Sequence, residues 1–124
     1  MTSLSVGKII RSMMMADASI KTKATKVFPV VTDKANLPYI AYRRAGIEPK
    51  PFKGGNADTV TVEVLVFAAD YESGVELAED VRRVLDCQQG EIDGLTMRSC
   101  TLADGEEAYQ DDAYVQKLVF TIKA

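Results

Sequence analysis

The sequence contains no histidine among its 124 residues and only two cysteines, Cys87 and Cys100. Without histidine, the common Ser–His and Cys–His forms of nucleophilic catalysis are excluded, because the base that activates the nucleophile is missing. The two cysteines have no CxxC spacing, so they predict neither a disulfide framework nor a four-ligand zinc site. We therefore expect both to be free, partly buried thiols.

Long hydrophobic runs are missing as well. No apolar stretch approaches the ~18–20 residues that a membrane-spanning helix needs, and the first residues lack the pattern of a secretory signal. A cytoplasmic protein without membrane contact is therefore predicted. The 47% hydrophobic and 27% charged residues are ordinary globular values. Since no linker or internal repeat divides the chain, we expect residues 1–124 to form one domain.

Charge is unevenly distributed, although the net charge is only −3. Residues 1–55 contain ten basic and three acidic residues, a net charge of +7, whereas residues 56–124 contain five basic and fifteen acidic residues, a net charge of −10. Such asymmetry occurs in proteins that bind nucleic acid or membranes. It also suits a ring in which the basic surface of one copy meets the acidic surface of another. A third interpretation is that both surfaces are simply solvated.

No pattern of polar residues predicts a catalytic or cofactor site. Three pairs of adjacent carboxylates fall on flexible loops or solvated helix faces, where nothing separates their two pKa values: Glu79-Asp80, Glu106-Glu107 and Asp111-Asp112. The acid-rich segment 104–112 lacks the register of a calcium-binding loop. Gly54-Gly55 does not lie at a turn from a strand into a helix, where phosphate binds. We therefore predict a protein that is not an enzyme and has no cofactor or metal.

The N-terminal third predicts a helix followed by an extended segment. Apolar residues with helical spacing predict a helix over residues 3–15, capped by Thr2 or Ser3. They are Val6, Ile9, Ile10, Met13 and Met14. Residues 27–31 are apolar and mostly β-branched, but Pro29 cannot donate a ladder hydrogen bond, so an edge strand or extended segment is expected there. Residues 33–36 have the composition of a turn.

The middle of the chain predicts two strands joined by an unusually long loop. The strands cover residues 38–46 and 59–68, and the second alternates strictly between valines and mostly polar residues. The connection over 47–58 is longer than an ordinary hairpin loop. Prolines stiffen it and Gly54-Gly55 lets the chain turn back. This segment therefore has the character of a projecting cationic arm.

The last third predicts a helix and two further strands. An apolar stripe indicates a helix over residues 73–85, with Ser73 as its cap and Glu76 completing a capping box; Gln88 to Gly90 would end it. Strands are expected over 95–102 and 114–122, with an acidic loop or hairpin end at 104–112. The order α-(β)-β-β-α-β-β predicts an α+β fold, a mainly antiparallel sheet with two helices packed on it.

Several segments together resemble a family of small tail proteins of long-tailed phages, whose members are similar to tail terminators and tail-to-head joining proteins. The resemblance covers roughly residues 4–122. It is carried by Leu37 to Arg43, the proline-containing loop, Thr59 to Phe67, Tyr71, Ala78 to Leu85, and Tyr114 to Ile122.

The resemblance implies a structural role in the virion tail, after assembly in the host bacterial cytoplasm. Such proteins form homohexameric rings that cap the tail tube at its final length and offer a surface to the head connector protein. No cofactor is involved, and nucleic acid only passes through the ring lumen. Two alternatives remain open. One is another neck or tube-like tail subunit, and the other is a small nucleic-acid-binding module that uses the basic and aromatic residues of the arm. The sequence pI of about 5.0 disfavours the nucleic-acid-binding module.

A ring of identical copies needs two different contact surfaces on each copy. The charge asymmetry supplies a candidate pair, one basic and one acidic. The basic surface comprises Arg43, Arg44, Lys50, Phe52 and Lys53, and the acidic surface comprises Asp104, Glu106, Glu107, Asp111 and Asp112. We expect these residues to contact neighbouring subunits or the tail tube protein.

Overall fold

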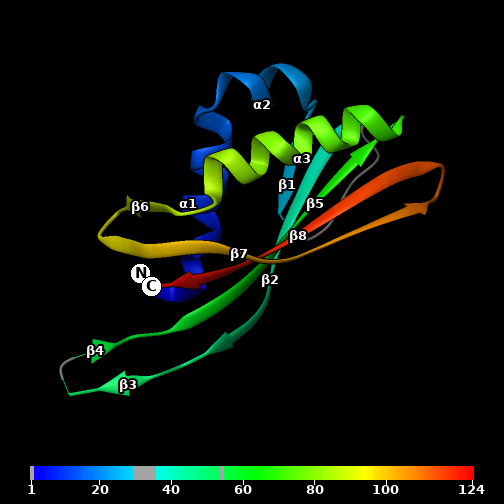
Figure 1. Cartoon of the computed structure of the whole chain (residues 1–124). Helices are drawn as coiled ribbons and strands as arrows, with labels where there is room; N and C mark the ends of the chain where they lie inside the picture. The colour runs from blue at the N-terminus through cyan, green and yellow to red at the C-terminus, as the bar shows by residue number, and fades with distance from the viewer. Residues whose placement is uncertain (1, 30–35, 54) are drawn as a thin grey trace.

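The computed structural model describes residues 2–29, 36–53 and 55–124. Its elements follow the order η1(Ser3–Ser5), α1(Val6–Ala16), α2(Ala18–Lys23), β1(Val27–Pro29), β2(Tyr39–Glu48), β3(Pro51–Phe52), β4(Gly55–Asn56), β5(Thr59–Ala68), α3(Tyr71–Leu85), β6(Gln88–Ile92), β7(Leu95–Gln110) and β8(Ala113–Lys123). Six strands form one curled sheet in the order β1-β2-β5-β8-β7-β6, in which only β1 and β2 are parallel (Figure 1). The predicted α+β class with a mainly antiparallel sheet is confirmed.

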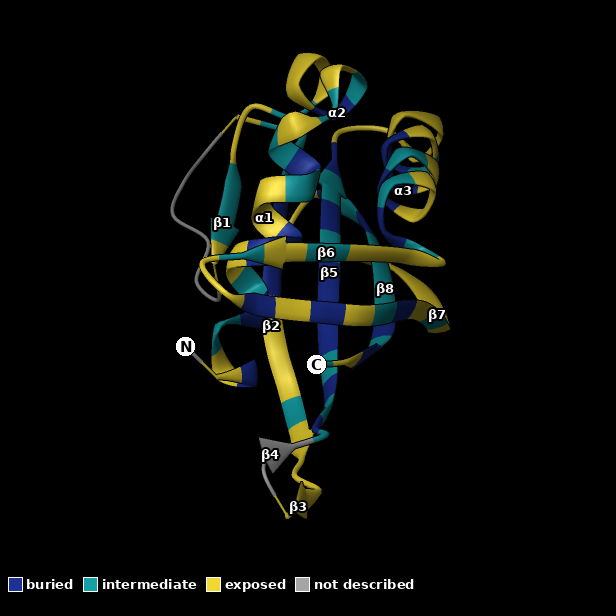
Figure 2. Cartoon of the chain, turned by 90° about the vertical axis from the view of Figure 1, so that its left-hand side faces the viewer, coloured by how far each residue is buried: buried dark blue, intermediate teal, exposed yellow. Residues whose placement is uncertain are grey.

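Strand β5 lies in the middle of the sheet and has the predicted bounds. It pairs along its whole length with β8 and along most of it with β2. Its valines, Val60, Val62, Val64 and Val66, occupy alternate positions and therefore one face, and all four are almost completely buried. Figure 2 shows β5 coloured mainly as buried along its length. Helices α1 and α3 supply buried side chains to the same core, as the alternation in sequence predicts.

Helix α1 begins later than predicted. Thr2 caps the short 3₁₀ turn η1 by accepting a hydrogen bond from the Leu4 amide, and the α-helix itself begins at Val6. The predicted apolar stripe is buried except for Met13, which is partly buried against the core. The helix packs closely on β6: a Cβ added to Gly90 would come 2.7 Å from Ile9 Cγ2. Glycine at position 90 therefore permits this close approach.

Helix α3 has the predicted buried stripe but a different cap. Ser73 is not the cap: the helix begins at Tyr71, and Asp70 accepts hydrogen bonds from the amide and hydroxyl of Ser73, at 2.8 and 2.9 Å. Asp70 takes this place because its extended backbone turns its carboxylate onto the free amides of the first turn. The helix ends at Leu85, as predicted. The residues expected to end it, Gln88 to Gly90, instead belong to strand β6.

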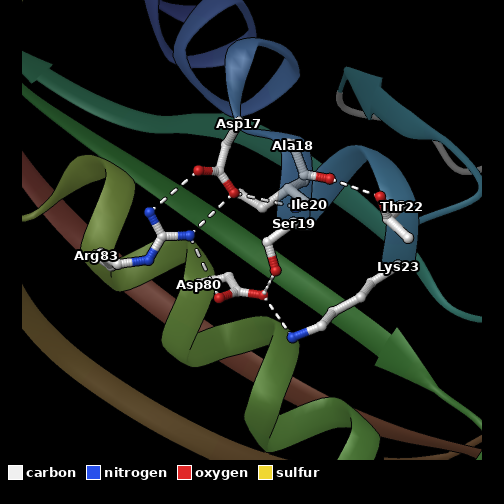
Figure 3. A network of polar contacts seen from close by, with 8 residues as sticks. All are labelled: Asp17, Ala18, Ser19, Ile20, Thr22, Lys23, Asp80 and Arg83. Atoms are coloured by element: carbon white, nitrogen blue, oxygen red, sulfur yellow. Dashed lines mark hydrogen bonds and ion pairs between the residues drawn. The ribbon is translucent and has the colours of Figure 1, made fainter.

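Helix α2 was missed by the sequence analysis. Asp17 caps it by accepting from the Ile20 amide at 3.1 Å, and Ile20 is completely buried. Arg83 of α3 donates two hydrogen bonds to Asp17, at 3.0 and 3.1 Å, and these lower the pKa of Asp17. Figure 3 shows how this contact fastens α2 to α3.

A second carboxylate, Asp80, completes the fastening of α2 (Figure 3). It accepts from Lys23 Nζ and Ser19 Oγ, both at 2.8 Å. Burial acts to raise the pKa of Asp80, but the hydrogen bonds from Lys23, Ser19 and Arg83 outweigh it and hold the pKa below its ordinary value. Lys23 is therefore half of a structural ion pair.

The remaining expectations concern the edge strand and the cysteines. β1 occupies the edge of the sheet as predicted, whereas its suggested continuation over residues 30–31 lies outside the described residues, as does most of the turn at 33–36. Both cysteines are free thiols, Cys87 exposed and Cys100 buried. Burial raises the pKa of Cys100 to about 12, so this thiol is unreactive at neutral pH.

Candidate assembly surfaces

The predicted loop over residues 47–58 is largely a β-hairpin. Strand β2 runs to Glu48, and β3 pairs with β4 beyond it. A strand can form here despite Pro51, which pairs with Asn56. Both strands of a two-stranded ribbon are edge strands, and an edge strand tolerates a proline, which has no amide to donate. We call residues 48–53 and 55–58 the arm. Figure 1 shows it projecting from the sheet on the side away from α2 and α3.

The root of the arm is held by Asp58, whose role the sequence did not reveal. This carboxylate is only 7% exposed, accepts a hydrogen bond from Ser3 Oγ, and accepts another from the Lys50 amide at 3.3 Å. The backbone of Asp58 exchanges two hydrogen bonds with Ala124, at 3.0 and 3.1 Å. The direction of the arm is therefore tied to both ends of the chain.

The basic residues expected on one surface are divided by the structure. Lys50, Phe52 and Lys53 are exposed on the arm, and neither lysine forms an ion pair with any described residue. Arg43 instead pairs with Glu63 at 2.8 Å, and Arg44 donates to the Leu4 carbonyl at 3.1 Å. Lys50 and Lys53 on the arm are therefore available for a partner.

Arg43 belongs to a charged cluster on the sheet face opposite the helices. Glu63 is 8% exposed there and accepts from Arg43 at 2.8 Å and from Lys117 at 3.1 Å. Burial acts to raise the pKa of Glu63, but these two cations outweigh it and lower the pKa. Lys117 also reaches Glu106 at 3.8 Å. Glu106 thus has a partner within its own chain.

The acidic segment 104–112 is a hairpin end, the second of the two forms expected for it. Strand β7 continues to Gln110, and only Asp111 and Asp112 form the turn into β8, with φ values of 50° and 62°. Aspartate is one of the few residue types that adopts such left-handed conformations readily. All five predicted acidic site residues are exposed on this hairpin end. We call residues 104–112 the acidic hairpin.

Three tyrosines surround a hollow beside the acidic hairpin, a feature that the sequence analysis missed. Tyr114 contacts Tyr109 edge to face at 4.9 Å between ring centroids and Tyr71 at 6.1 Å. Glu107 accepts from Tyr71 Oη at 2.8 Å and from Gln116 at 3.0 Å. These hydrogen bonds, that of Gln116 first, lower the pKa of Glu107, and Glu107 in turn raises the pKa of Tyr71.

The tyrosine hollow is small, and three of its six lining residues are tyrosines. Its volume is about 190 Å³, below the roughly 300–1,000 Å³ typical of small-molecule sites. Tyr71 is 47% and Tyr109 62% exposed. A sequence signal was available in part, because Tyr109 and Tyr114 flank the Asp111-Asp112 turn as a cross-strand pair. Tyr71 joins them only through the tertiary fold.

The arm and the acidic hairpin lie at opposite ends of the molecule. Figure 1 shows the arm at the lower left and the tip of β7 and β8 at the right, with the sheet between them. They cannot meet within one molecule, so each is available to another. Among the described residues, no helix has the length and apolarity to cross a membrane, and no group of three or more potential ligands is placed to hold a metal ion.

Comparison with known proteins adds a family and a fold. The family model described as "Tail completion protein gp17" matches residues 8–124. A chain in the structure of the "Virion of native gene transfer agent (GTA) particle" superposes with a TM-score of 0.84, covering 98% of this chain and 96% of that chain. At 14% identity this similarity establishes a shared fold. No curated protein matches the sequence.

Proposed function

Because this chain belongs to the tail completion protein gp17 family, and is therefore a structural, non-enzymatic component of a phage virion tail, we propose that it is the tail terminator. In this role six copies form a ring that caps the tail tube at its final length. The ring stops further addition of tube protein and offers its other surface to the head connector. Nucleic acid passes through its lumen without being recognised.

The observation that carries this proposal is the pair of unlike charged surfaces at opposite ends of the molecule (Figure 1). A head-to-tail contact between unlike surfaces generates a closed ring when the rotation between copies closes, and a filament when it does not. The arm presents Lys50 and Lys53, and the acidic hairpin presents Asp104, Asp111 and Asp112, all exposed. The contact of arm with acidic hairpin is therefore the proposed subunit interface.

An interface held only by such exposed charges would be weak and sensitive to salt. Exposed charges are screened beyond about 8 Å at physiological ionic strength, and isolated surface pairs contribute roughly 0–1 kcal/mol. Charge complementarity would therefore direct the approach and orientation of copies more than it holds them. The similarity of fold to a chain of the gene transfer agent virion is in keeping with a protein that works within a particle.

Charge reversal of the arm tests the proposal. Lys50→Glu with Lys53→Glu should reduce the fraction of hexamer in native mass spectrometry and light scattering, and added salt should partly restore the hexamer, because it screens the repulsion between the reversed arm and the acidic hairpin. The matched control is Lys8→Glu with Lys21→Glu, two exposed lysines outside both surfaces, which should leave the hexamer intact. Adding Asp104→Lys to the arm variant should restore part of the assembly, because the two surfaces become more nearly complementary again.

Other assembly states would overturn the terminator role in distinct ways. Filaments would indicate a tube-like subunit, and monomers that bind an oligonucleotide would indicate a nucleic-acid-binding module. A wild-type protein that stays monomeric at every concentration, and also on purified tail tubes, would contradict the ring altogether.

A further inference from the structure

Four of the five large hydrophobic side chains that are exposed among the described residues lie at the same two ends as the unlike charges, and Leu4 is the exception. Among the described residues, the large hydrophobic side chains that are exposed are Leu4, Ile47, Phe52, Tyr71 and Tyr109. Ile47 and Phe52 lie at the base and on the arm, and Tyr71 and Tyr109 line the tyrosine hollow. Aromatic side chains left in water on a soluble protein mark contact surfaces when they are gathered in this way.

Phe52 has the chemistry of an anchor residue. Its side chain is 59% exposed, and Lys53 follows it directly on the projecting hairpin. A rigid aromatic ring costs little conformational entropy on binding, and aromatic anchors that enter a pocket dominate many interfaces. The neighbouring lysines restrict the partner to a surface that is aromatic and negatively charged.

The tyrosine hollow is such a surface. It provides three aromatic rings for edge-to-face contact with a fourth ring. The Glu107 carboxylate lies in the lining, and Asp111 and Asp112 lie just beyond Tyr109. Its volume of about 190 Å³ suits one large side chain more than a substrate. Lysines beside the inserted ring would lie near these carboxylates. They would also lie near the faces of the tyrosine rings, and aromatic faces attract cations.

We propose that Phe52 of one copy inserts into the hollow formed by Tyr71, Tyr109 and Tyr114 of the next copy. This inference rests on the proposed head-to-tail ring and deepens it by naming the apolar contact that holds what the charges orient. The occupant is a second copy of this chain, because the arm carries the complement of the charge around the hollow and lies at the far end of the same molecule (Figure 1). The contact thus repeats from each copy to the next around the ring.

Cross-linking of single-cysteine variants tests this contact. In a Cys87→Ser background, only the buried Cys100 remains as a native thiol. A Phe52→Cys variant is mixed with a Tyr109→Cys variant and treated with a short bismaleimide. Covalent dimers are expected in the mixture and not in either variant alone. Leu4→Cys, at a site 57% exposed against 59% for Phe52, replaces Phe52→Cys in the matched control and should give no dimers.

A second variant measures the strength of the contact. Phe52→Ala should raise the subunit concentration needed for ring formation by about 10-fold or more, as loss of an aromatic anchor typically does. Phe52→Tyr should retain most of the assembly, because the ring that fills the hollow is kept.

The outcomes separate this inference from the proposed function. A hexamer that forms without cross-links between positions 52 and 109 overturns the inserted phenylalanine and leaves the terminator role standing. Equal cross-linking from position 4, or cross-links from position 52 to tail tube protein instead of a second copy, also overturns it. A protein that forms no ring alone or on tail tubes overturns both.

Discussion

Strand β2 consists of two halves that differ in burial and in their neighbouring elements. Its first half, Ile40 to Tyr42, is buried between β1 and β5, whereas from Arg43 to Glu48 it is mainly exposed (Figure 2). Its partner β5 keeps its valines buried over the same length. The first half contributes to the core, and the second extends into the arm. Stability and assembly are thus separated along a single strand.

The same separation governs the charged residues. In the packed part, Asp17, Asp80 and Glu63 each have cationic partners within 3.1 Å. On the arm, Lys50 and Lys53 have none among the described residues. Charges with internal partners fasten one element to another, as α2 to α3. Lys50 and Lys53 remain free to contact another molecule, so these two groups of charges should respond differently to mutation.

Replacing a phenylalanine by alanine in each part should give the largest contrast. Phe120 is completely buried in β8, and Phe120→Ala should lower the free energy of unfolding by about 3–5 kcal/mol through lost burial and a cavity. Phe52→Ala removes the same atoms from the arm and should change stability by less than about 0.5 kcal/mol. Urea denaturation of the two variants measures both values. A comparable loss in both would show that the arm is part of the stability core.

Alanine in place of glycine should give an intermediate contrast. The Cβ of Gly90→Ala would meet Ile9 Cγ2 at 2.7 Å, and a buried β-branched side chain cannot move aside cheaply, so a loss of about 1–3 kcal/mol is expected. Gly46, in the exposed half of β2, has nothing within 4 Å of an added Cβ. Gly46→Ala should be neutral within about 0.5 kcal/mol. Equal thermal midpoints for both variants would contradict the close packing of α1 on β6.

The packed part was largely predictable from the sequence, because its signals are periodic. The alternating valines of β5 and the helical stripes of α1 and α3 gave the correct elements and faces. The elements missed or shortened have weak periodicity: α2 has one buried residue, Ile20, and the outer end of β7 is exposed on both sides. Short, polar elements of this kind are stabilised by tertiary partners such as Arg83, which local patterns do not reveal.

The candidate surfaces were only half predictable. Charge can be counted in a sequence, so the basic arm and the acidic hairpin were identified. The spatial neighbours of a residue cannot be read from the sequence in this way. Arg43 is paired with Glu63, and Tyr71 lies beside a hairpin more than thirty positions away in the sequence. Asp58 shows the same limit, because its partners include Ser3 and Ala124, which lie far from it in the sequence.

Acid should produce the smallest effect and should act on the packed part through Asp80. Its folded pKa lies below the ordinary value, so its contribution to stability is complete above about pH 4, the ordinary range of aspartate, and is lost as the pH falls through the folded pKa. Asp80→Asn cannot titrate. The variant should therefore be less stable than the wild type at pH 6, and this difference should shrink towards pH 3.

The size of that difference in stability shows whether the ion pairs of Asp80 contribute to the free energy of unfolding. Partly exposed pairs contribute roughly 0–1 kcal/mol, so a difference of this order at pH 6 is expected in urea denaturation. Because Asp80 receives hydrogen bonds from both α2 and its own helix, loss of the carboxylate should release α2 first, seen as faster amide hydrogen exchange at Ile20. A difference that stays constant from pH 6 to pH 3 would mean that Asp80 stabilises α2 by its shape alone and not by its charge.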